Sequence, residues 1–377
     1  MTRRVDVIVA GSGPAGGTAA FFLGQAGKRV LVLEKETLPR YKTCGGAVSL
    51  NVLNQFPFSF EPVIQSKVNA ISYAVEEKMV TIPLKDSSLC MVMREEFDAY
   101  LIRHAQAEIL EGQAVRGVEE TPDSVAVQTV DGQRFEADYL VAADGANSIV
   151  ARSLNLRRKK VLAGAIEIKA TVPAEILARY ANKPVLVFGE VGIGYLWVFP
   201  KADHVSVGVG GLNPKPGELQ AALERVMEHH GISIHDQPRR GHPIPIYSRP
   251  EQISTARTLL AGDAAGLVDP FTGEGIRFAI KSGRLAAEAI LAGQPERYAA
   301  SVRRQIGRNH RLGSLLTGLF YPLTGLFFEL ALRNPALSHG LVKTVDDRIG
   351  YGRLLFKLAG TFPLFMLTKK IETSRVW

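Results

Sequence analysis

The chain has 377 residues, which is long enough for two or three domains and a large buried core. Hydrophobic residues make up 46% and charged residues 22%, a composition that excludes an intrinsically disordered chain. The formal charge of +8 is compatible with an acidic protein partner, an anionic lipid surface or a pyrophosphate-bearing ligand. A basic surface that only aids solubility explains it equally well. Nucleic acid is not an expected partner, because no basic run is interleaved with aromatic residues.

Cysteine and histidine usage argues against disulfides and metal sites. Cys44 and Cys90 are the only cysteines, and their wide spacing favours a reducing compartment. The eight histidines show no ligand spacing with the cysteines or carboxylates, so no metal site is predicted. The start MTRR, followed by an apolar run, imitates a signal peptide. We do not expect one, because the mature fold needs Asp6 and the glycines after it.

The segment from Val5 to Glu34 organises the chain. It predicts a buried strand, a glycine turn with Gly11, Gly13 and Gly16, a helix, and a second strand that ends in Glu34. The glycines allow a tight turn, a close approach to a pyrophosphate and close packing of helix on strand. An anion is favoured at the helix N-terminus, and an acid about 20 residues past the glycines suits ribose hydroxyls. We therefore predict a dinucleotide site rather than a chance glycine turn.

The next segment with a special composition is Tyr41 to Ser49, YKTCGGAVS. Its Cys44-Gly45-Gly46 run indicates a backbone that passes close to a flat or bulky group. The residues alone favour another interpretation, a surface turn with a small buried cysteine. Residues 68–84 predict strands of a different layer.

A helix is predicted from Arg94, with an apolar side that includes Phe97 and Leu101. An arginine at the start of such a helix either reaches a cofactor or is a solvated charge. Strands and hairpins then alternate over residues 113–143, with an Asp131-Gly132 turn.

A second strand-to-turn element follows the buried strand Tyr139–Ala143. It reads ADGANSIVAR and includes Asp144, Gly145 and Ser148. We expect the backbone to approach a ligand here as well.

Residues 161–212 predict the strands of a second sheet. Within it, GYLWVFP places Tyr195, Trp197 and Phe199 on one face, because side chains of a strand alternate with period two. On pattern alone, such an aromatic stripe is more often core than a binding wall. Gly208 to Gly211 lack the spacing of a second GxGxxG and are interpreted as a strand. A helix is expected over Leu219 to His230.

A third element of the same kind begins at Thr258. A strand to Ala261 ends in Gly262-Asp263, and Gly273-Glu274-Gly275 lead into a long helix. Small residues on that helix, including Ala279 and Gly283, permit close packing. No internal repeat is present.

After residue 300 the sequence becomes rich in long apolar runs. Leu312 to Phe328 carry no charged residue, but this run is shorter than the roughly 20 residues of a membrane span, and Pro322 interrupts it. Residues 354–367 are again apolar. Buried helices, a pocket for a long hydrocarbon and a membrane-surface contact all fit, whereas a true span is not expected.

The elements GSGPAGG, ADGANS and AGDAAG with its GEG loop resemble the FAD-binding signature of the p-hydroxybenzoate hydroxylase superfamily. Within it, CGGA, DGANS, GYLWVFPKADHVSVGVG and GEGIRFAIKSGRLAAEAI resemble the geranylgeranyl reductase family, including its chlorophyll-pathway members. The resemblance covers most of residues 5–290, and the tail after 300 matches more loosely.

The resemblance implies an α/β (α+β) fold. A Rossmann-like FAD-binding domain with a central parallel sheet would be joined by an antiparallel-sheet substrate domain and a helical C-terminal region. The implied ranges are 1–67, 94–160 and 248–300 for the FAD-binding domain, 68–93 and 161–247 for the substrate domain, and 301–377 for the helical region.

The resemblance also implies roles for individual residues. The cofactor-binding set would be Gly11, Gly13, Pro14, Ala15, Gly16, Glu34, Lys35, Cys44, Gly45, Gly46, Ala47, Arg94, Asp144, Gly145, Gly262, Asp263, Gly273, Gly275 and Ile276. The substrate would contact Tyr195, Trp197, Phe199 and Pro200. Cys44 would be the proton donor, with Tyr195 or a water held by the Gly45-Gly46 backbone as the alternatives.

The implied activity is FAD-dependent hydrogenation of carbon–carbon double bonds in a geranylgeranyl chain. NADPH or reduced ferredoxin would supply the electrons, and ferredoxin would suit the positive charge. An FAD monooxygenase or halogenase and a non-catalytic prenyl carrier are the competing interpretations. The expected location is cytoplasmic or peripheral to a membrane, with the C-terminal region as the contact. The residues leave open the headgroup of the substrate and the number of bonds reduced.

Overall fold

A computed structural model describes residues 3–84, 88–333, 340, 343–344, 349–361 and 373–375. The chain divides into two compact units. The first unit comprises Met1–Lys42, Arg94–Val161 and Ile244–Arg311, and the second comprises Thr43–Met93, Leu162–Pro243 and Leu312–Trp377. The expected helical region 301–377 is not a separate unit, because residues 301–311 belong to the first unit and 312–377 to the second. The expected boundaries also differ at residues 43–67, which we placed with the FAD-binding part. They belong to the second unit because strands β3 and β4 within them both pair with β7.

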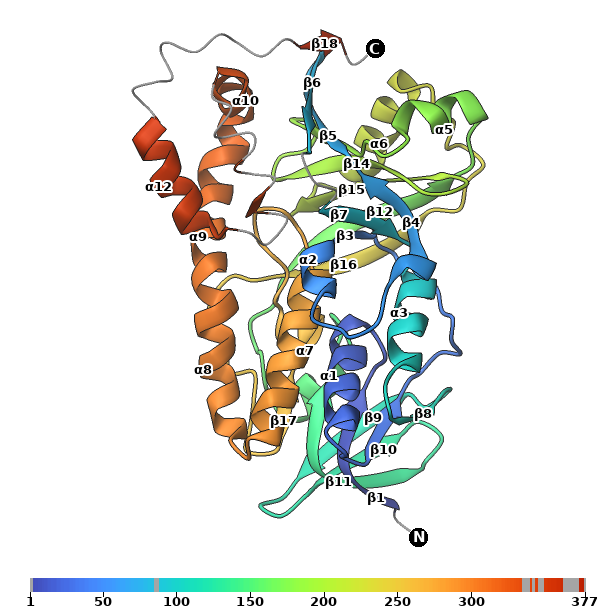
Figure 1. Cartoon of the computed structure of the whole chain (residues 1–377), viewed down its shortest axis with the longest axis vertical. Coiled ribbons are helices and arrows are strands. Elements are labelled where there is room, and N and C mark those ends of the chain that lie inside the picture. Colours follow the sequence, from blue (N-terminus) through green and yellow to red (C-terminus); the bar gives the residue numbers. More distant parts are fainter. Residues whose placement is uncertain are drawn as a thin grey trace. The chain divides into compact units, whose positions relative to one another are not determined.

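The first unit is built on a seven-stranded sheet in the order β8-β2-β1-β11-β10-β9, with β17 beside β11 (Figure 1). Strands β8, β2, β1, β11 and β17 pair in parallel, whereas β9, β10 and β11 form an antiparallel meander. The strands are β1 (Arg3–Ala10), β2 (Val30–Leu33), β8 (Glu108–Leu110), β9 (Val115–Glu120), β10 (Val125–Thr129), β11 (Arg134–Ala142) and β17 (Thr258–Leu260).

Helices cover this sheet where the sequence supplies small side chains. In α1 (Pro14–Gln25) most residues are buried, and its alanines and glycines let α7 (Ile276–Leu291) lie beside it. The two helices lie close together at Gly283, where a Cβ would lie 2.2 Å from the carbonyl oxygen of Ala15. The unit also contains α3 (Arg94–Arg103), α4 (Ile149–Ser153) and α8 (Tyr298–Val302). This packing fixes the N-terminus of α1 at the carboxyl end of β1, where parallel α/β sheets bind their ligands.

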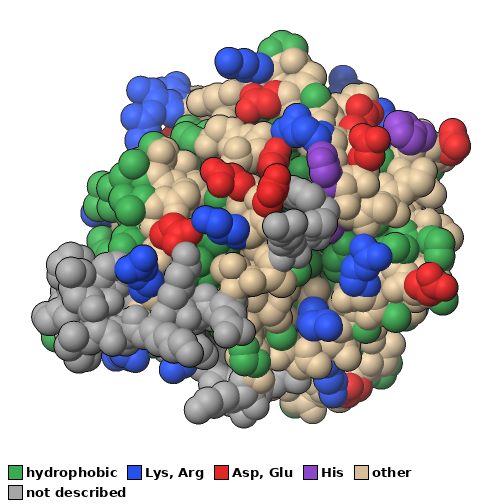
Figure 2. All heavy atoms as spheres, turned by 90° about the horizontal axis from the view of Figure 1, so that it is seen from above, with side chains coloured by type: hydrophobic (Ala, Val, Ile, Leu, Met, Phe, Trp, Pro, Cys, Tyr) green, Lys and Arg blue, Asp and Glu red, His purple; other side chains and the backbone are tan. Residues whose placement is uncertain are grey.

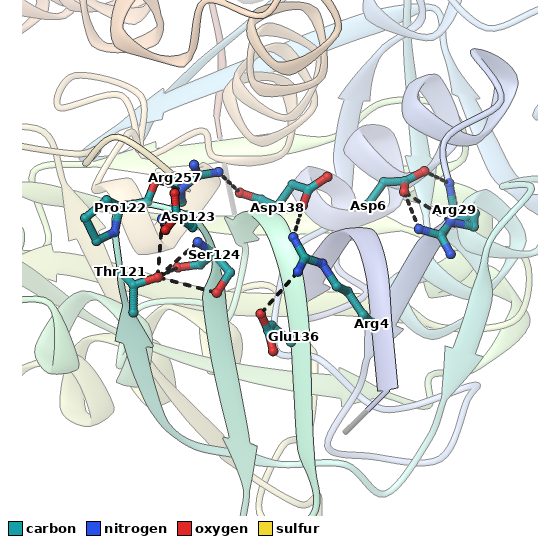
Figure 3. A network of polar contacts seen from close by, with 10 residues as sticks. All are labelled: Arg4, Asp6, Arg29, Thr121, Pro122, Asp123, Ser124, Glu136, Asp138 and Arg257. Carbon is teal, nitrogen blue, oxygen red and sulfur yellow. Dashed lines mark hydrogen bonds and ion pairs between the residues drawn. The ribbon is translucent and has the colours of Figure 1, made fainter. Parts of the chain in front are cut away.

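A network of polar contacts lies on exposed residues of the same sheet (Figure 3). Arg4 pairs with Asp138 at 3.0 Å, Arg29 pairs with Asp6 at 2.7 Å, and Arg257 donates to the carbonyl oxygen of Asp138 at 3.0 Å. Exposed pairs of this kind contribute little to stability, because water screens their charges. We therefore interpret the network as a solvated surface and give it no functional role.

The second unit contains an eight-stranded and a three-stranded sheet. The larger has the order β16-β12-β15-β14-β13-β5-β6-β18, and the smaller has the order β3-β7-β4. The strands are β3 (Ala47–Ser49), β4 (Ile64–Val68), β5 (Ala70–Val75), β6 (Lys78–Pro83), β7 (Leu89–Val92), β12 (Val161–Ala170), β13 (Val185–Phe188), β14 (Gly194–Pro200), β15 (Val205–Leu212), β16 (Arg240–Ile246) and β18 (Ser374–Arg375).

Two helices cover one face of the larger sheet. Leu223 and Val226 of α6 (Glu218–His229) are buried with Val207 and Val209 of β15, and residues of α5 (Ala174–Tyr180) join the same cluster. The sequence did not predict α5. Its short amphipathic turn sits between two predicted strands, where the pattern gives no separate signal. The short α2 (Leu50–Leu53) is capped by the Ser49 side chain.

The C-terminal part of the second unit is helical, as expected. It includes α9 (Arg308–Phe320), which begins in the first unit, α10 (Thr324–Arg333) and α12 (Tyr351–Thr361). Pro322 lies in a 3₁₀ turn between α9 and α10. Within Pro295–Arg333, an 18-residue window with a mean hydropathy of 1.6 meets the length and composition of a membrane span, and 28% of it is buried. Much of the apolar run Leu354–Leu367 lies outside the described residues.

The predicted fold class is confirmed, because the chain combines a parallel sheet with helices, antiparallel sheets and a helical C-terminal region. The helix from Arg94, the strand at Thr258 and the helix after Gly275 all form where the sequence predicts them. Gly208 to Gly211 lie in β15, which confirms that they are a strand and not a second nucleotide loop.

Candidate functional site: a nucleotide cradle and a cysteine loop

The first glycine turn follows directly on β1. Gly11 has a φ of +93°, and a Cβ there would lie 2.5 Å from the carbonyl oxygen of Ala143. A Cβ on Gly16 would lie 1.9 Å from the carbonyl oxygen of Gly11. Neither position admits a side chain, since real Cβ atoms do not approach backbone so closely. Pro14 is the first residue of α1, so the turn leads directly into the helix N-terminus.

Glu34 lies where β2 ends and is almost fully buried. Its carboxylate accepts hydrogen bonds from the backbone N–H of Ser12 at 2.9 Å and from the Ser12 hydroxyl at 2.5 Å. Burial alone would raise the pKa of Glu34, but the Ser12 hydroxyl and the nearby charge of Arg40 outweigh it and lower that pKa. Glu34 is therefore an ionised acceptor beside the glycine turn.

Two arginines lie beside the turn and share one carboxylate. Arg94 donates twice to Asp98, at 2.8 and 2.7 Å, and Arg40 lies 3.2 Å from the same side chain. A Cβ on Gly13 would lie 3.6 Å from Arg40 and 3.9 Å from Arg94. Among the described residues, the buried Nη1 atom of Arg40 has no hydrogen-bond partner. An anion at the N-terminus of α1 would supply one.

We expect Arg40→Met to weaken FAD binding by about 10–100-fold, because charge-assisted hydrogen bonds contribute about 1.5–3 kcal/mol. The dissociation constant is measured by titrating FAD into flavin-free protein. Arg103→Met, which removes an exposed arginine at the end of α3, is the matched control and should bind as the unchanged protein does. Equal affinities for all three proteins would remove Arg40 from the site.

The second element, ADGANS, lies next to the first turn. A Cβ on Gly11 would lie 3.3 Å from the Cα atom of Asp144. One carboxylate oxygen of Asp144 accepts from the backbone N–H groups of Ile149 and Val150, at 2.8 and 3.1 Å. Its other oxygen is buried and has no partner among the described residues, and burial raises the pKa of Asp144. A polar ligand group would satisfy that oxygen.

The third element reaches the same place from β17. Gly262 has a φ of +58°, and a Cβ on it would lie 3.0 Å from the Cβ of Ala15. Its backbone N–H donates to the Ser282 hydroxyl at 2.9 Å, and Arg157 donates to the carbonyl oxygen of Asp263 at 2.8 Å. A Cβ on Gly275 would lie 3.6 Å from a carboxylate oxygen of Asp263. Three loops far apart in the sequence thus converge within the first unit.

The remaining predicted cofactor residues of this unit have defined places. Ile276 is the first residue of α7, Gly273 has a φ of +68° and Gly145 has a φ of +82°. Lys35 is exposed and lies 3.5 Å from Glu36. The cradle fits FAD, because buried side-chain atoms of Arg40 and Asp144 have no hydrogen-bond partner among the described residues, and the Cβ position of Gly145 meets no atom within 4 Å.

The predicted CGGA residues, Cys44 to Ala47, belong to the second unit. The backbone N–H of Cys44 donates to the buried Glu167 at 2.8 Å, and the side-chain ammonium of Lys201 donates to the carbonyl oxygen of Gly45 at 2.7 Å. Gly46 has a φ of +71°. The alternative prediction was a surface turn with a small buried cysteine, but Cys44 is only half-buried. The loop is held from two sides because its backbone bonds both charged groups.

The aromatic stripe faces this loop. The rings of Tyr195 and Trp197 are 6.4 Å apart, and those of Trp197 and Phe199 are 6.2 Å apart, so the three share one face of β14. A Cβ on Gly45 would lie 2.8 Å from the Phe199 ring and 3.1 Å from the indole nitrogen of Trp197. Tyr195 and Phe199 are half-buried and Pro200 is buried. The flat group that Gly45 passes is therefore this pair of rings.

Sequence reasoning missed four charged residues of the two sites, namely Arg40, Arg157, Glu167 and Lys201. Lys201 directly follows GYLWVFP, and Glu167 is an acid within an otherwise apolar strand. Both are almost fully buried, which is rare for such residues and marks a special role. Over the described part of the chain, no group of three or more His, Cys, Asp or Glu residues could hold a metal ion.

Comparison with known proteins agrees with the geometry. Residues 4–293 match the model of the FAD binding domain family. A geranylgeranyl diphosphate reductase of Oryza sativa is 32% identical over 85% of this chain and 76% of its own. A menaquinone reductase of Mycobacterium tuberculosis is 26% identical over 91% of each chain.

Solved structures show the same fold. A geranylgeranyl bacteriochlorophyll reductase-like protein of Thermoplasma acidophilum superposes with a TM-score of 0.77 at 23% identity, over 97% of this chain and 98% of its own. Flavin-dependent halogenases and a monooxygenase share the fold at 20% identity or less. The chain therefore belongs to the FAD-binding geranylgeranyl reductase family and is an FAD-dependent oxidoreductase.

Proposed function

We propose that the protein hydrogenates carbon–carbon double bonds of a geranylgeranyl chain. The observation that carries this proposal is the Cys44-Gly45-Gly46 loop, whose Gly45 packs against Trp197 and Phe199. A half-buried thiol, next in sequence to a glycine that packs on two aromatic rings, suits an apolar chain that needs a proton. The relatives named geranylgeranyl diphosphate reductase support the substrate class.

The cradle of the first unit would hold FAD. Gly11, Gly13 and the N-terminus of α1 would bind the pyrophosphate, and Glu34 the ribose hydroxyls. Arg94, Asp144 and Asp263 would flank the ligand, while Gly273, Gly275 and Ile276 would lie against the isoalloxazine. The N-terminus of α7 would stabilise negative charge there. The CGGA loop of the second unit would border the substrate.

When bound and reduced, FAD supplies a hydride. An isolated alkene has no carbonyl group to hold developing negative charge, so the second carbon must be protonated as the hydride arrives. Cys44 would donate that proton, with Tyr195 as the alternative donor. Trp197 and Phe199 would exclude water and stabilise cation-like character on the chain.

A reductase and an oxygenase on this fold differ in their use of oxygen. The reduced holoenzyme should be reoxidised by a geranylgeranyl substrate under anaerobic conditions. Oxygen consumed in proportion to product would instead identify a monooxygenase or halogenase. Protein that never retains flavin would favour a prenyl carrier. Comparing anaerobic flavin bleaching by NADPH and by reduced ferredoxin identifies the electron donor.

We further propose that the C-terminal helices contact a lipid surface, from which a prenyl lipid would be drawn. Leu315, Leu319, Leu323 and Leu326 are 71%, 52%, 43% and 55% exposed, and their spacing places them on one helical stripe. On α12, Phe356 is 83% exposed. The opposite side of α10 is occupied, because Phe328 and Leu332 pack with β5 and β6.

The charge around this apolar stripe suits anionic lipid. The exposed charged residues of α10 and α12 are basic, namely Arg333, Arg353 and Lys357. The acid Glu329 of α10 pairs with Lys78 at 2.9 Å. Figure 2 shows hydrophobic side chains next to Lys and Arg side chains at one edge of the molecular face drawn there. Apolar contact combined with basic charge is the usual means of peripheral binding.

We expect Leu319→Glu with Leu326→Glu to lower binding to anionic vesicles by at least about tenfold, since burying one leucine contributes about 1.5–3 kcal/mol. Co-sedimentation measures the bound fraction. Val130→Glu is the matched control, because Val130 is 65% exposed on the first unit. Unchanged sedimentation of the double variant would exclude this surface.

A further inference from the structure

Lys201 is a buried cation whose hydrogen-bond partners are neutral. Its ammonium donates to the carbonyl oxygens of Gly45 and Val92, at 2.7 and 3.1 Å, and only 4% of the residue is exposed. Among the described residues, it forms no ion pair within 4.0 Å. A buried charge is costly unless a counter-charge or several donors and acceptors compensate it. The two hydrogen bonds hold the loop, but they leave the positive charge of Lys201 without a counter-charge.

The thiol of Cys44 lies in the same cluster. A Cβ on Gly46 would lie 3.0 Å from the Lys201 nitrogen, and the backbone N–H of Gly46 points to the Cys44 sulfur at 3.4 Å. The cation thus contacts the residue that follows Cys44, and an N–H group points at the sulfur; a nearby cation and such an N–H group favour a thiolate. Neither stabilises a neutral thiol to the same degree.

Glu167 fixes the loop from the other side. One of its oxygens accepts the N–H of Cys44, and the other accepts the Ser206 hydroxyl at 2.9 Å. The indole N–H of Trp197 lies 3.5 Å from that same hydroxyl. The carboxylate is thereby oriented by the strand that carries Ser206, and its hydrogen bond sets where the Cys44 backbone lies.

We propose that Lys201 is a positioning residue that supplies the counter-charge for a Cys44 thiolate when the thiol gives its proton to the alkene. This inference rests on the proposed function. The S–H bond of Cys44 breaks, the proton forms a C–H bond at one alkene carbon, and the electron pair stays on sulfur. The other carbon receives the hydride supplied by reduced FAD. A proton from Lys201 or water then restores the thiol.

The charge state of Lys201 sets the pH range in which it can balance the charge of a Cys44 thiolate. Burial lowers the pKa of Lys201 to about 8, while its interactions with Cys44, Glu167 and Cys90 oppose the shift and Lys169 adds to it. The ammonium is present below that pH and is lost as the pH rises through it. Above pH 8, Lys201 should therefore progressively lose both the charge that balances a thiolate and the proton that it could return to the sulfur.

The test is the alkylation rate of Cys44 by iodoacetamide in the resting holoenzyme at pH 7, followed by peptide mass. Cys90 does not interfere, because it is fully buried and burial raises its pKa to about 12. We expect Lys201→Met to slow Cys44 alkylation at least tenfold and Lys201→Arg to keep it within threefold. Glu167→Gln, which removes a negative charge but keeps an acceptor, should accelerate it.

The direction of the change in alkylation rate distinguishes the loss of the Lys201 charge from a loss of structure. A loop loosened by Lys201→Met would expose the thiol and raise the rate, so a fall cannot come from unfolding. A rate that is unchanged or raised in Lys201→Met overturns the proposal. The alkylation assay needs no prenyl substrate, so its result does not depend on prenyl reduction. A failure to observe prenyl reduction would contradict the proposed function but not the role of Lys201.

Discussion

Gly16→Ala should yield a protein that does not retain FAD. The new methyl group would lie 1.9 Å from the carbonyl oxygen of Gly11 and 3.1 Å from the side chain of Val9. Because the first of these neighbours is backbone, the turn itself must open. The N–H groups at the start of α1 would then no longer converge on one anion. The measurement is the ratio of flavin to protein absorbance after purification.

Gly117→Ala is the matched control for this change. It makes the same substitution within the first unit, at a glycine of β9 that has no atom within 4 Å of its Cβ position. That variant should keep its full flavin content. A Gly16→Ala protein that retains equal flavin would show that the turn does not bind the cofactor.

Gly45→Ala should abolish most prenyl reduction while leaving the flavin in place. Its methyl group would lie 2.8 Å from the Phe199 ring and 3.1 Å from the indole nitrogen of Trp197, so the loop or the rings must shift. A displacement of about 1 Å in a positioned reactant can cost about 100-fold in rate. We expect a loss of that order in the anaerobic reoxidation of reduced enzyme by the prenyl substrate.

The control for this second variant is Gly192→Ala in the same unit, where the Cβ position meets no atom within 4 Å. It should reduce the substrate at the rate of the unchanged protein. Full activity in Gly45→Ala, with normal flavin content, would mean that the loop does not position the substrate or the thiol.

The nucleotide elements were predictable because their physics is local. A glycine with a positive φ, a strand that ends in an acid and a helix N-terminus are all encoded within about 30 residues, as from Val5 to Glu34. The aromatic stripe follows in the same way from the period of a strand. The Cys44-Gly45-Gly46 run also indicated a backbone close to a flat or bulky group, although the residues alone favoured a surface turn and did not identify the rings of Trp197 and Phe199.

The missed residues act through contacts that are distant in the sequence. Glu167 bonds a backbone group 123 residues away, and Lys201 bonds one 156 residues away. The periodicity of hydrophobic residues in the sequence does not predict such pairs, because strand β12 reaches the cysteine loop only in the folded chain. Arg40 was missed for a related reason, because its partner Asp98 lies in a helix that begins 54 positions later, at Arg94.

The claim that supports the rest is that a bound flavin and the cysteine loop together hydrogenate a prenyl chain. The direct measurement is to incubate the anaerobically reduced holoenzyme with geranylgeranyl diphosphate and with geranylgeranyl-chlorophyll and to determine product masses. We predict products heavier by two hydrogen atoms for each bond reduced, formed without oxygen. Unchanged substrate masses with both compounds, or products that contain added oxygen, would contradict it.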